Sequence, residues 1–137
     1  MTKGSVKVGI IGLGRWARVL TWAAKKSQKL EIITGFSRSE EKRVAFEQDT
    51  GIPSANTIED LLANPEIVGV ILTVPNEQHL PVAGQVAKAG KHIYVEKPMA
   101  RNSHEAHQLF KAAEASDKKV CVAHYRRKLP LFIRINE

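Results

Sequence analysis

The sequence predicts an α/β protein built on a doubly wound, mostly parallel sheet with helices on both faces. Apolar runs of strand length alternate with longer segments of helical periodicity along the chain. The strand candidates are continuous apolar runs without polar alternation, which is typical of strands covered on both faces. No internal repeat, low-complexity tract or linker divides the 137 residues, so we expect one compact unit.

The expected elements alternate strictly. We expect strands at VKVGII (6–11), LEIITGF (30–36), VGVILTV (68–74), HIYVE (92–96) and KVCVAH (119–124), with a short weak strand near IPSA (52–55). We expect helices at about 15–28, 39–50, 58–63, 79–89 and 103–116. This order of strands and helices forms right-handed crossovers on a parallel sheet.

Residues at the helix ends justify these boundaries. Gly51 and Gly90 can end helices in the left-handed conformation, and the pair Asn64–Pro65 can end another. Ser103 is expected to cap the last of these helices.

Composition excludes several classes of protein. No stretch reaches the roughly 20 apolar residues that a membrane span requires, and the chain enters a strand pattern without a cleavable apolar leader. We therefore predict a cytoplasmic protein that has no membrane partner. No residues are proposed as metal ligands. Cys121 is the only cysteine and lies in an apolar run, which predicts a buried, unreactive thiol.

The net charge of +7 raises the question of nucleic-acid binding. Much of this charge comes from KKSQK (25–29), DKK (117–119) and YRRK (125–128), and no stacking aromatic residues are interleaved with these clusters. We therefore predict a solvated basic surface and no nucleic-acid partner. A basic surface also suits an anionic cofactor.

The first strand runs into GLGRWA, which has the spacing G-x-G-x-x-A directly before a helical segment. Gly12 permits a tight turn, Gly14 allows backbone to approach a pyrophosphate, and Ala17 allows close packing of helix on strand. Leu13, Arg15 and Trp16 lie in the same segment and are expected at the cofactor as well. The alternative is a turn without a ligand, but the strand before it and the helix after it favour a dinucleotide site.

The end of the second strand discriminates between the two nicotinamide cofactors. Proteins that prefer NAD place an acidic side chain about 20 residues past the glycines, to bind the ribose hydroxyls. Ser37 and Arg38 occupy that place here and suit a 2′-phosphate, which favours NADP, with NAD still possible. Glu31 lies at the wrong end of the strand. The alternative for Arg38 is an exposed loop residue.

The strand at 68–74 ends in TVPNEQHLP, on the same side of the sheet. Pro81 belongs in the first turn of the following helix, which leaves residues 75–78 as a loop. Asn76 could simply cap that helix, and His79 could be an ordinary surface histidine.

VEKP ends the neighbouring strand, so Glu96 and Lys97 are expected at the nicotinamide end of the cleft. Pro98 restricts the backbone of Lys97 and can hold the peptide bond between them cis. The alternative is a surface ion pair between neighbours, but adjacent strand residues point to opposite faces.

Four segments resemble the N-terminal domain of the family of glucose-fructose oxidoreductase, inositol dehydrogenase and MocA (Gfo/Idh/MocA). They are GIIGLGRWA (9–17), TVPNEQH (73–79), AGKHIYVEKPMA (89–100) and VAHYRRKLP (122–130), in family order. The resemblance implies a Rossmann dinucleotide-binding fold over residues 1–125. It also implies an oxidoreductase that moves a hydride between a nicotinamide and a carbinol carbon of a sugar, cyclitol or related polyol.

The resemblance assigns roles to individual residues. Lys97 is similar to the family's lysine that hydrogen-bonds the reacting oxygen and helps to transfer its proton. Glu96 would line the cofactor site. Thr73, Val74, Pro75, Asn76 and His79 would border the ribose and the nicotinamide.

The C-terminal segment resembles the family only in part. Arg126 and Arg127 match a basic pair near the cofactor and the substrate entrance, so Arg126 is also a cofactor candidate, whereas Lys128 replaces a frequent aromatic residue. Residues 126–137 would begin a connection to a second domain, absent here, that supplies most of the substrate pocket. Pro130 can start a helix whose apolar residues need a partner surface.

Two interpretations remain open. The chain is the cofactor domain of a dehydrogenase that forms a homo-oligomer when intact, in which case this chain alone is inactive. Alternatively, it is a stand-alone or truncated nucleotide-binding module without catalysis.

Overall fold

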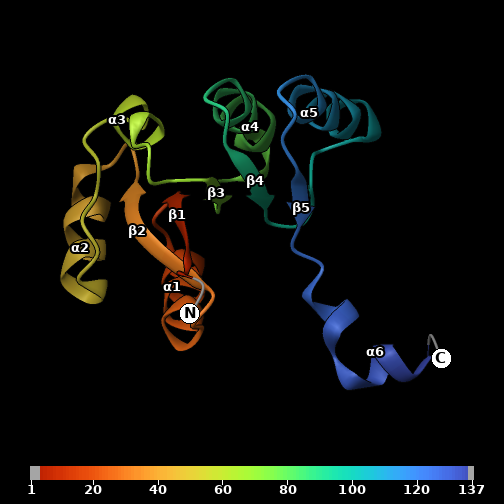
Figure 1. Cartoon of the computed structure of the whole chain (residues 1–137), viewed down its shortest axis with the longest axis horizontal. Helices are drawn as coiled ribbons and strands as arrows, with labels where there is room; N and C mark the ends of the chain where they lie inside the picture. Colours follow the sequence, from red (N-terminus) through yellow and green to blue (C-terminus); the bar gives the residue numbers. More distant parts are fainter. Residues whose placement is uncertain (1–3, 136–137) are drawn as a thin grey trace.

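The computed structural model describes residues 4–135, and within them five strands form one sheet in the order β2-β1-β3-β4-β5 (Figure 1). The strands are β1 (Val6–Ile11), β2 (Leu30–Phe36), β3 (Gly69–Leu72), β4 (His92–Val95) and β5 (Val120–Val122). All four pairings are parallel. The predicted class, a doubly wound parallel sheet of the Rossmann type, is therefore confirmed.

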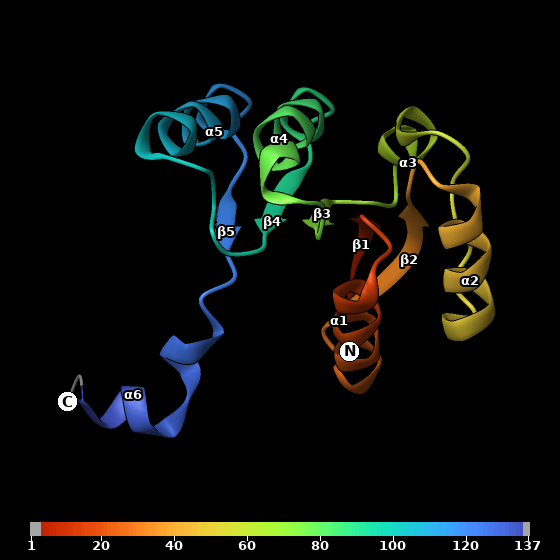
Figure 2. The ribbon, with the colours of Figure 1, turned by 180° about the vertical axis from the view of Figure 1, so that it is seen from behind.

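Helices connect the strands and lie on both sides of the sheet (Figures 1 and 2). They are α1 (Arg15–Lys26), α2 (Glu40–Thr50), α3 (Ile58–Ala63), α4 (His79–Lys88), α5 (Ser103–Ala115) and α6 (Pro130–Ile135), with short 3₁₀ turns η1 (Asn76–Gln78) and η2 (Tyr125–Lys128). In both views α3, α4 and α5 lie on one side and α1 on the other. None of the helices within residues 4–135 is both long enough and apolar enough to cross a membrane.

Two apolar clusters, one on each face, hold the layers together. Under α3, α4 and α5 the buried residues include Leu61, Leu72, Val86, Val95 and Leu109. Burying each large side chain of this kind contributes roughly 1.5–3 kcal/mol. The second cluster packs α1 and α2 against β1 and β2, and it includes Ile10, Leu13, Ala17, Ile32 and Phe46.

Several predicted boundaries change in the structure. Gly51 and Gly90 do adopt the left-handed conformation, each with φ 73°. Asn102, and not Ser103, caps α5, because its side-chain oxygen accepts a 2.9 Å hydrogen bond from the Glu105 amide. The expected strand at 52–55 is reduced to a single bridge between Gly35 and Ser54. Residues 136 and 137 of the expected connection lie outside the described residues.

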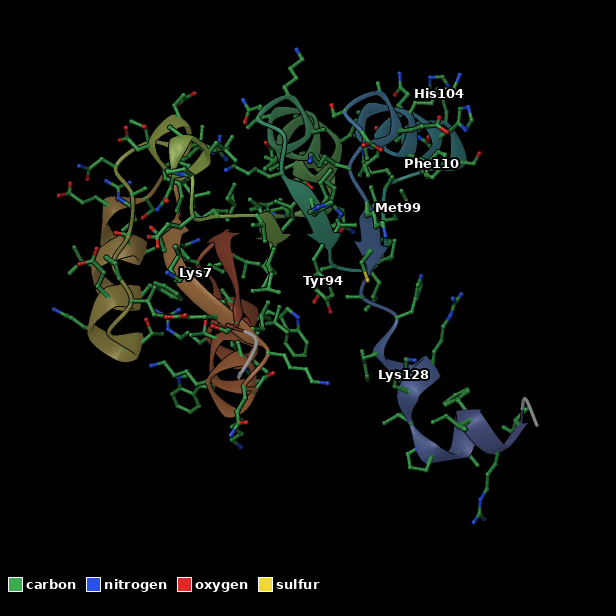
Figure 3. The ribbon with its side chains drawn as sticks, in the orientation of Figure 1. Lys7, Tyr94, Met99, His104, Phe110 and Lys128 are labelled. Atoms are coloured by element: carbon green, nitrogen blue, oxygen red, sulfur yellow. The ribbon has the colours of Figure 1, made fainter. Side chains whose placement is uncertain are left out.

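The prediction that helices cover both faces of the sheet was wrong for the half formed by β3, β4 and β5. On the α1 side this half borders an open groove of about 460 Å³, into which Tyr94 extends from β4 (Figure 3). Helix α6 leads away from the sheet instead of covering it (Figures 1 and 2). Cys121, predicted to be buried, is therefore exposed on this face.

Candidate functional site

The sheet has a topological switch point between β1 and β3. β1 pairs with β2 on one side and with β3 on the other, so the connections that follow β1 and β3 leave in opposite directions and open a crevice. A groove of about 490 Å³ lies at these strand ends. It is lined by Ile11, Gly12, Leu13, Gly14, Phe36, Ser37, Arg38, Ser39, Lys42, Ile58, Val74, Pro75, Gln78, Pro81, Val82 and Gln85.

Gly12 makes the turn that opens this groove. Its φ is +95°, and a Cβ there would lie 2.7 Å from the backbone carbonyl of Thr73. The Gly12 amide donates a 2.9 Å hydrogen bond to the Phe36 carbonyl, and the Thr73 hydroxyl donates one of 2.6 Å to the Gly12 carbonyl. The turn is thus fixed from both neighbouring strands, and only glycine fits it.

The start of α1 leaves room and hydrogen-bond donors for an anion. A Cβ added to Gly14 would meet nothing within 4 Å. No side chain caps α1, and its first turn holds no acidic residue, so its first amides are free to bind a pyrophosphate. Ala17 is fully buried, as expected for close packing of helix on strand, whereas Arg15 lies outside the groove lining. These residues fit a dinucleotide.

The end of β2 supplies cations to the same groove. Ser37 and Arg38 are among its lining residues, and Arg38 is exposed. The Arg43 guanidinium donates a 2.7 Å hydrogen bond to the Ser37 carbonyl, which holds this loop against α2. Lys42 also lines the groove, although it is not among the residues predicted from the sequence. The signal was available, because a side chain in the first turn of a helix leans towards the helix N-terminus.

His79 is not among the residues that line the groove. Its side chain is 1% exposed, so the interpretation as a surface histidine is wrong. Nδ1 lies 2.9 Å from the Pro98 carbonyl oxygen, and Nε2 lies 3.0 Å from that of Val74. The ring therefore ties the end of β3 to the segment after β4. Asn76 belongs to the exposed turn η1 and neither lines the groove nor caps α4.

The segment after β4 brings two predicted residues to different surroundings. The Trp16 indole donates a 2.7 Å hydrogen bond to the Glu96 carboxylate, which joins β4 to the glycine turn. Lys97 is exposed and is followed by a cis peptide bond to Pro98. Lys97 lines a second pocket with His124, Tyr125, Arg126 and Arg127. Arg126, a cofactor candidate, thus lies on the lysine side of the site.

Comparison with known proteins agrees with this geometry. Residues 6–124 match the family model described as "Oxidoreductase family, NAD-binding Rossmann fold". Oxidoreductase P35 of Formosa agariphila is 38% identical over 131 residues, which cover 94% of this chain and 41% of that protein. The 1,5-anhydro-D-fructose reductase of Ensifer adhaerens is 28% identical, over 87% of this chain and 36% of its own length.

Solved structures agree over the same region. A candidate NADPH-dependent oxidoreductase from Desulfitobacterium hafniense superposes with a TM-score of 0.94 at 38% identity, over 98% of this chain and 39% of that one. The WlbA dehydrogenase of Chromobacterium violaceum, solved with NADH and UDP-GlcNAcA, gives a TM-score of 0.90 at 26% identity, over 98% and 39%.

The match extends over nearly all of this chain, which itself spans about two fifths of the length of the relatives compared. It includes the glycine turn, the end of β3 and the segment after β4. The chain therefore belongs to the Gfo/Idh/MocA oxidoreductases, and it corresponds to their N-terminal NAD(P)-binding Rossmann domain.

Proposed function

We propose that this chain binds a nicotinamide dinucleotide in the groove beside β1, with a preference for NADP(H) over NAD(H). The observation that carries the preference is the groove's lining at the end of β2, which includes Ser37, Arg38 and Lys42. Among the residues that the structure describes, no Asp or Glu lines the groove, so this lining lacks the acidic partner that is typical of NAD sites. Two cations and a hydroxyl suit a 2′-phosphate.

Lys97 is the residue that we propose for proton transfer. A bound nicotinamide accepts or supplies the hydride. In reduction the Lys97 ammonium would donate a proton to the carbonyl oxygen, and in oxidation the neutral amine would take the hydroxyl proton. Support comes from its place at the carboxyl end of β4, beside β3, whose end contributes Val74 and Pro75 to the groove. The substrate would be a sugar, cyclitol or related polyol.

The whole enzyme would need more chain than this. We propose that residues 1–125 form the cofactor domain and that residues 126–137 begin a connection to a second, substrate-binding domain. The intact protein would be a homo-oligomer. A second candidate function, a nucleotide-binding module without catalysis, is favoured by the open pocket at Lys97, since nothing within residues 4–135 closes it over a substrate.

Calorimetric titration of this chain with NADPH and with NADH, at one moderate salt concentration, tests the cofactor proposal. We expect NADPH to bind at least about tenfold more tightly, since a 2′-phosphate adds charge-assisted hydrogen bonds. Arg38→Ala should remove most of that difference, and Arg134→Ala, which changes an arginine on α6, should not. Equal affinity for both cofactors would contradict the preference, and binding of neither would contradict the function.

A further inference from the structure

The pocket that contains Lys97 is separate from the cofactor groove. Its volume is about 470 Å³, and its lining residues are Lys97, Ala123, His124, Tyr125, Arg126, Arg127 and Phe132. None of these residues lines the groove beside β1. Lys97 follows β4, and the other lining residues follow β5, where the chain leaves the sheet through η2. From there it continues to α6 (Figure 1).

The charge around this pocket is one-sided. Lys97, Arg126 and Arg127 are basic residues, His124 lines the pocket with them, and no Asp or Glu within residues 4–135 is in the lining. The ion pairs found within residues 4–135 are Lys7–Glu66, Arg18–Asp49 and Arg101–Glu105, and none of them involves a pocket residue.

The carboxylate nearest in sequence does not balance this charge. Glu96 precedes Lys97, but its side chain accepts the hydrogen bond from Trp16, on the side of the glycine turn. A cleft lined by charges of one sign concentrates ligands of the opposite sign. Arginine also presents a planar fork that matches a carboxylate or a phosphate with two parallel hydrogen bonds.

We propose that this pocket receives an anionic group of the substrate, which Arg126 and Arg127 bind while Lys97 faces the reacting carbinol. The substrate would then be a polyol that carries a carboxylate or a phosphate, such as a sugar acid or a sugar phosphate, and not a neutral sugar. This inference rests on the proposed function for the identity of the reacting group. Tyr125 and Phe132 give the pocket aromatic walls for the carbon skeleton.

Nuclear magnetic resonance of this 137-residue chain tests the inference, because arginine side-chain signals report weak binding at known positions. D-gluconate, D-glucose 6-phosphate and neutral D-sorbitol are titrated separately, each with and without saturating NADPH. We expect at least one of the two anions to shift the Arg126 and Arg127 signals. The affinity for D-sorbitol should be at least about tenfold lower than the affinity for that anion. The responding anion identifies the carboxylate or the phosphate class.

A pair of double variants separates specific binding from general attraction to a basic protein. Arg126→Gln/Arg127→Gln should lower the affinity for the anion at least about tenfold. Lys88→Gln/Lys111→Gln removes the same amount of charge from α4 and α5 and should leave the affinity for the anion unchanged. Similar shifts with D-sorbitol, no shift with either anion, or equal weakening by both double variants would overturn the inference.

The two proposals fail in distinguishable ways. If NADPH binds but the anions do not prefer the two arginines, the pocket assignment fails and the cofactor proposal stands. If NADPH does not bind while an anion still shifts both arginine signals, the cofactor proposal fails and the anion site stands.

Discussion

The indole nitrogen of Trp16 donates a hydrogen bond of 2.7 Å to the carboxylate of Glu96, across 80 positions of sequence. One residue follows the glycine turn, and the other precedes the proposed catalytic lysine. The bond therefore connects the part of the site that would bind pyrophosphate with the part that would carry out proton transfer.

Trp16→Phe keeps an aromatic ring but removes the donor. We expect the free energy of unfolding to fall by about 1 kcal/mol, the usual net value of one hydrogen bond. Trp22→Phe is a matched control, since Trp22 lies on the same helix and is 59% exposed, compared with 45% for Trp16. Urea denaturation of both variants measures the difference. Equal losses would show that the bond to Glu96 contributes nothing to stability.

The two glycines of the turn should respond differently to alanine. Gly12→Ala should cost about 2 kcal/mol or more of stability, because its φ is +95° and its Cβ would overlap the Thr73 carbonyl. Gly14→Ala should change stability by less than about 1 kcal/mol. It should lower the affinity for NADPH at least about tenfold, since the added Cβ would occupy the open space of the groove. Thermal unfolding and calorimetry measure the two effects, and the opposite pattern would contradict these assignments.

Lys42→Gln should lower the affinity for NADPH by roughly tenfold and change the affinity for NADH by no more than about threefold. The physical reason is that Lys42 lines the groove beside Arg38, where only the 2′-phosphate distinguishes the cofactors. Lys25→Gln provides the control for net charge, because Lys25 lies on α1 and bonds the Thr50 carbonyl, away from this groove. A parallel loss of NADPH and NADH affinity would place Lys42 at a group that both cofactors share.

Lys97→Ala should leave the affinity of this chain for NADPH nearly unchanged, because Lys97 lies outside the groove lining. In the whole enzyme the same change should lower turnover by about 10²- to 10⁴-fold, the usual contribution of a general acid or base. Calorimetry on the chain and steady-state kinetics on the enzyme provide the two measurements. A variant that loses cofactor binding with unchanged turnover at saturating cofactor would refute the catalytic role.

Stability should depend on pH through Glu47. Hydrogen bonds from the Ser54 hydroxyl and amide hold the pKa of the Glu47 carboxyl below its usual value of 4.5. The unfolded chain therefore binds this proton more readily than the folded one. The contribution is complete above about pH 4.5 and is lost as the pH falls through the lower folded pKa. Glu47→Gln should make the melting temperature depend less steeply on pH in this acid range. A variant with the same slope of melting temperature against pH as the original protein would contradict the assignment.

Most of the fold could be predicted because local signals and the fold agree. β1 and β2 have the residues that were predicted, since each is a continuous apolar run followed by a clear glycine or polar boundary. α6 also begins at Pro130 as expected. β3 and β5 are shorter than their apolar runs, since strand length is set by pairing with neighbours and not by hydrophobicity alone.

Parts of the site depended on contacts that no local pattern contains. The bond between Trp16 and Glu96 joins residues that are 80 positions apart in the sequence, and the burial of His79 requires both β3 and the turn after Lys97 to be in place. Cys121 illustrates the reverse case. Its apolar neighbours predict burial, but burial also needs a covering helix, which the described residues do not supply on that face.

The position of Gly12 at the end of β1 has a dynamic consequence. Because its amide is bonded to Phe36 of β2 while Thr73 after β3 is bonded back to it, the turn cannot open alone. Amide hydrogen exchange at Gly12 should then require unfolding of the sheet itself. A nucleotide bound at such a turn would stabilise the whole domain, so cofactor occupancy and resistance to unfolding would be two readouts of one equilibrium.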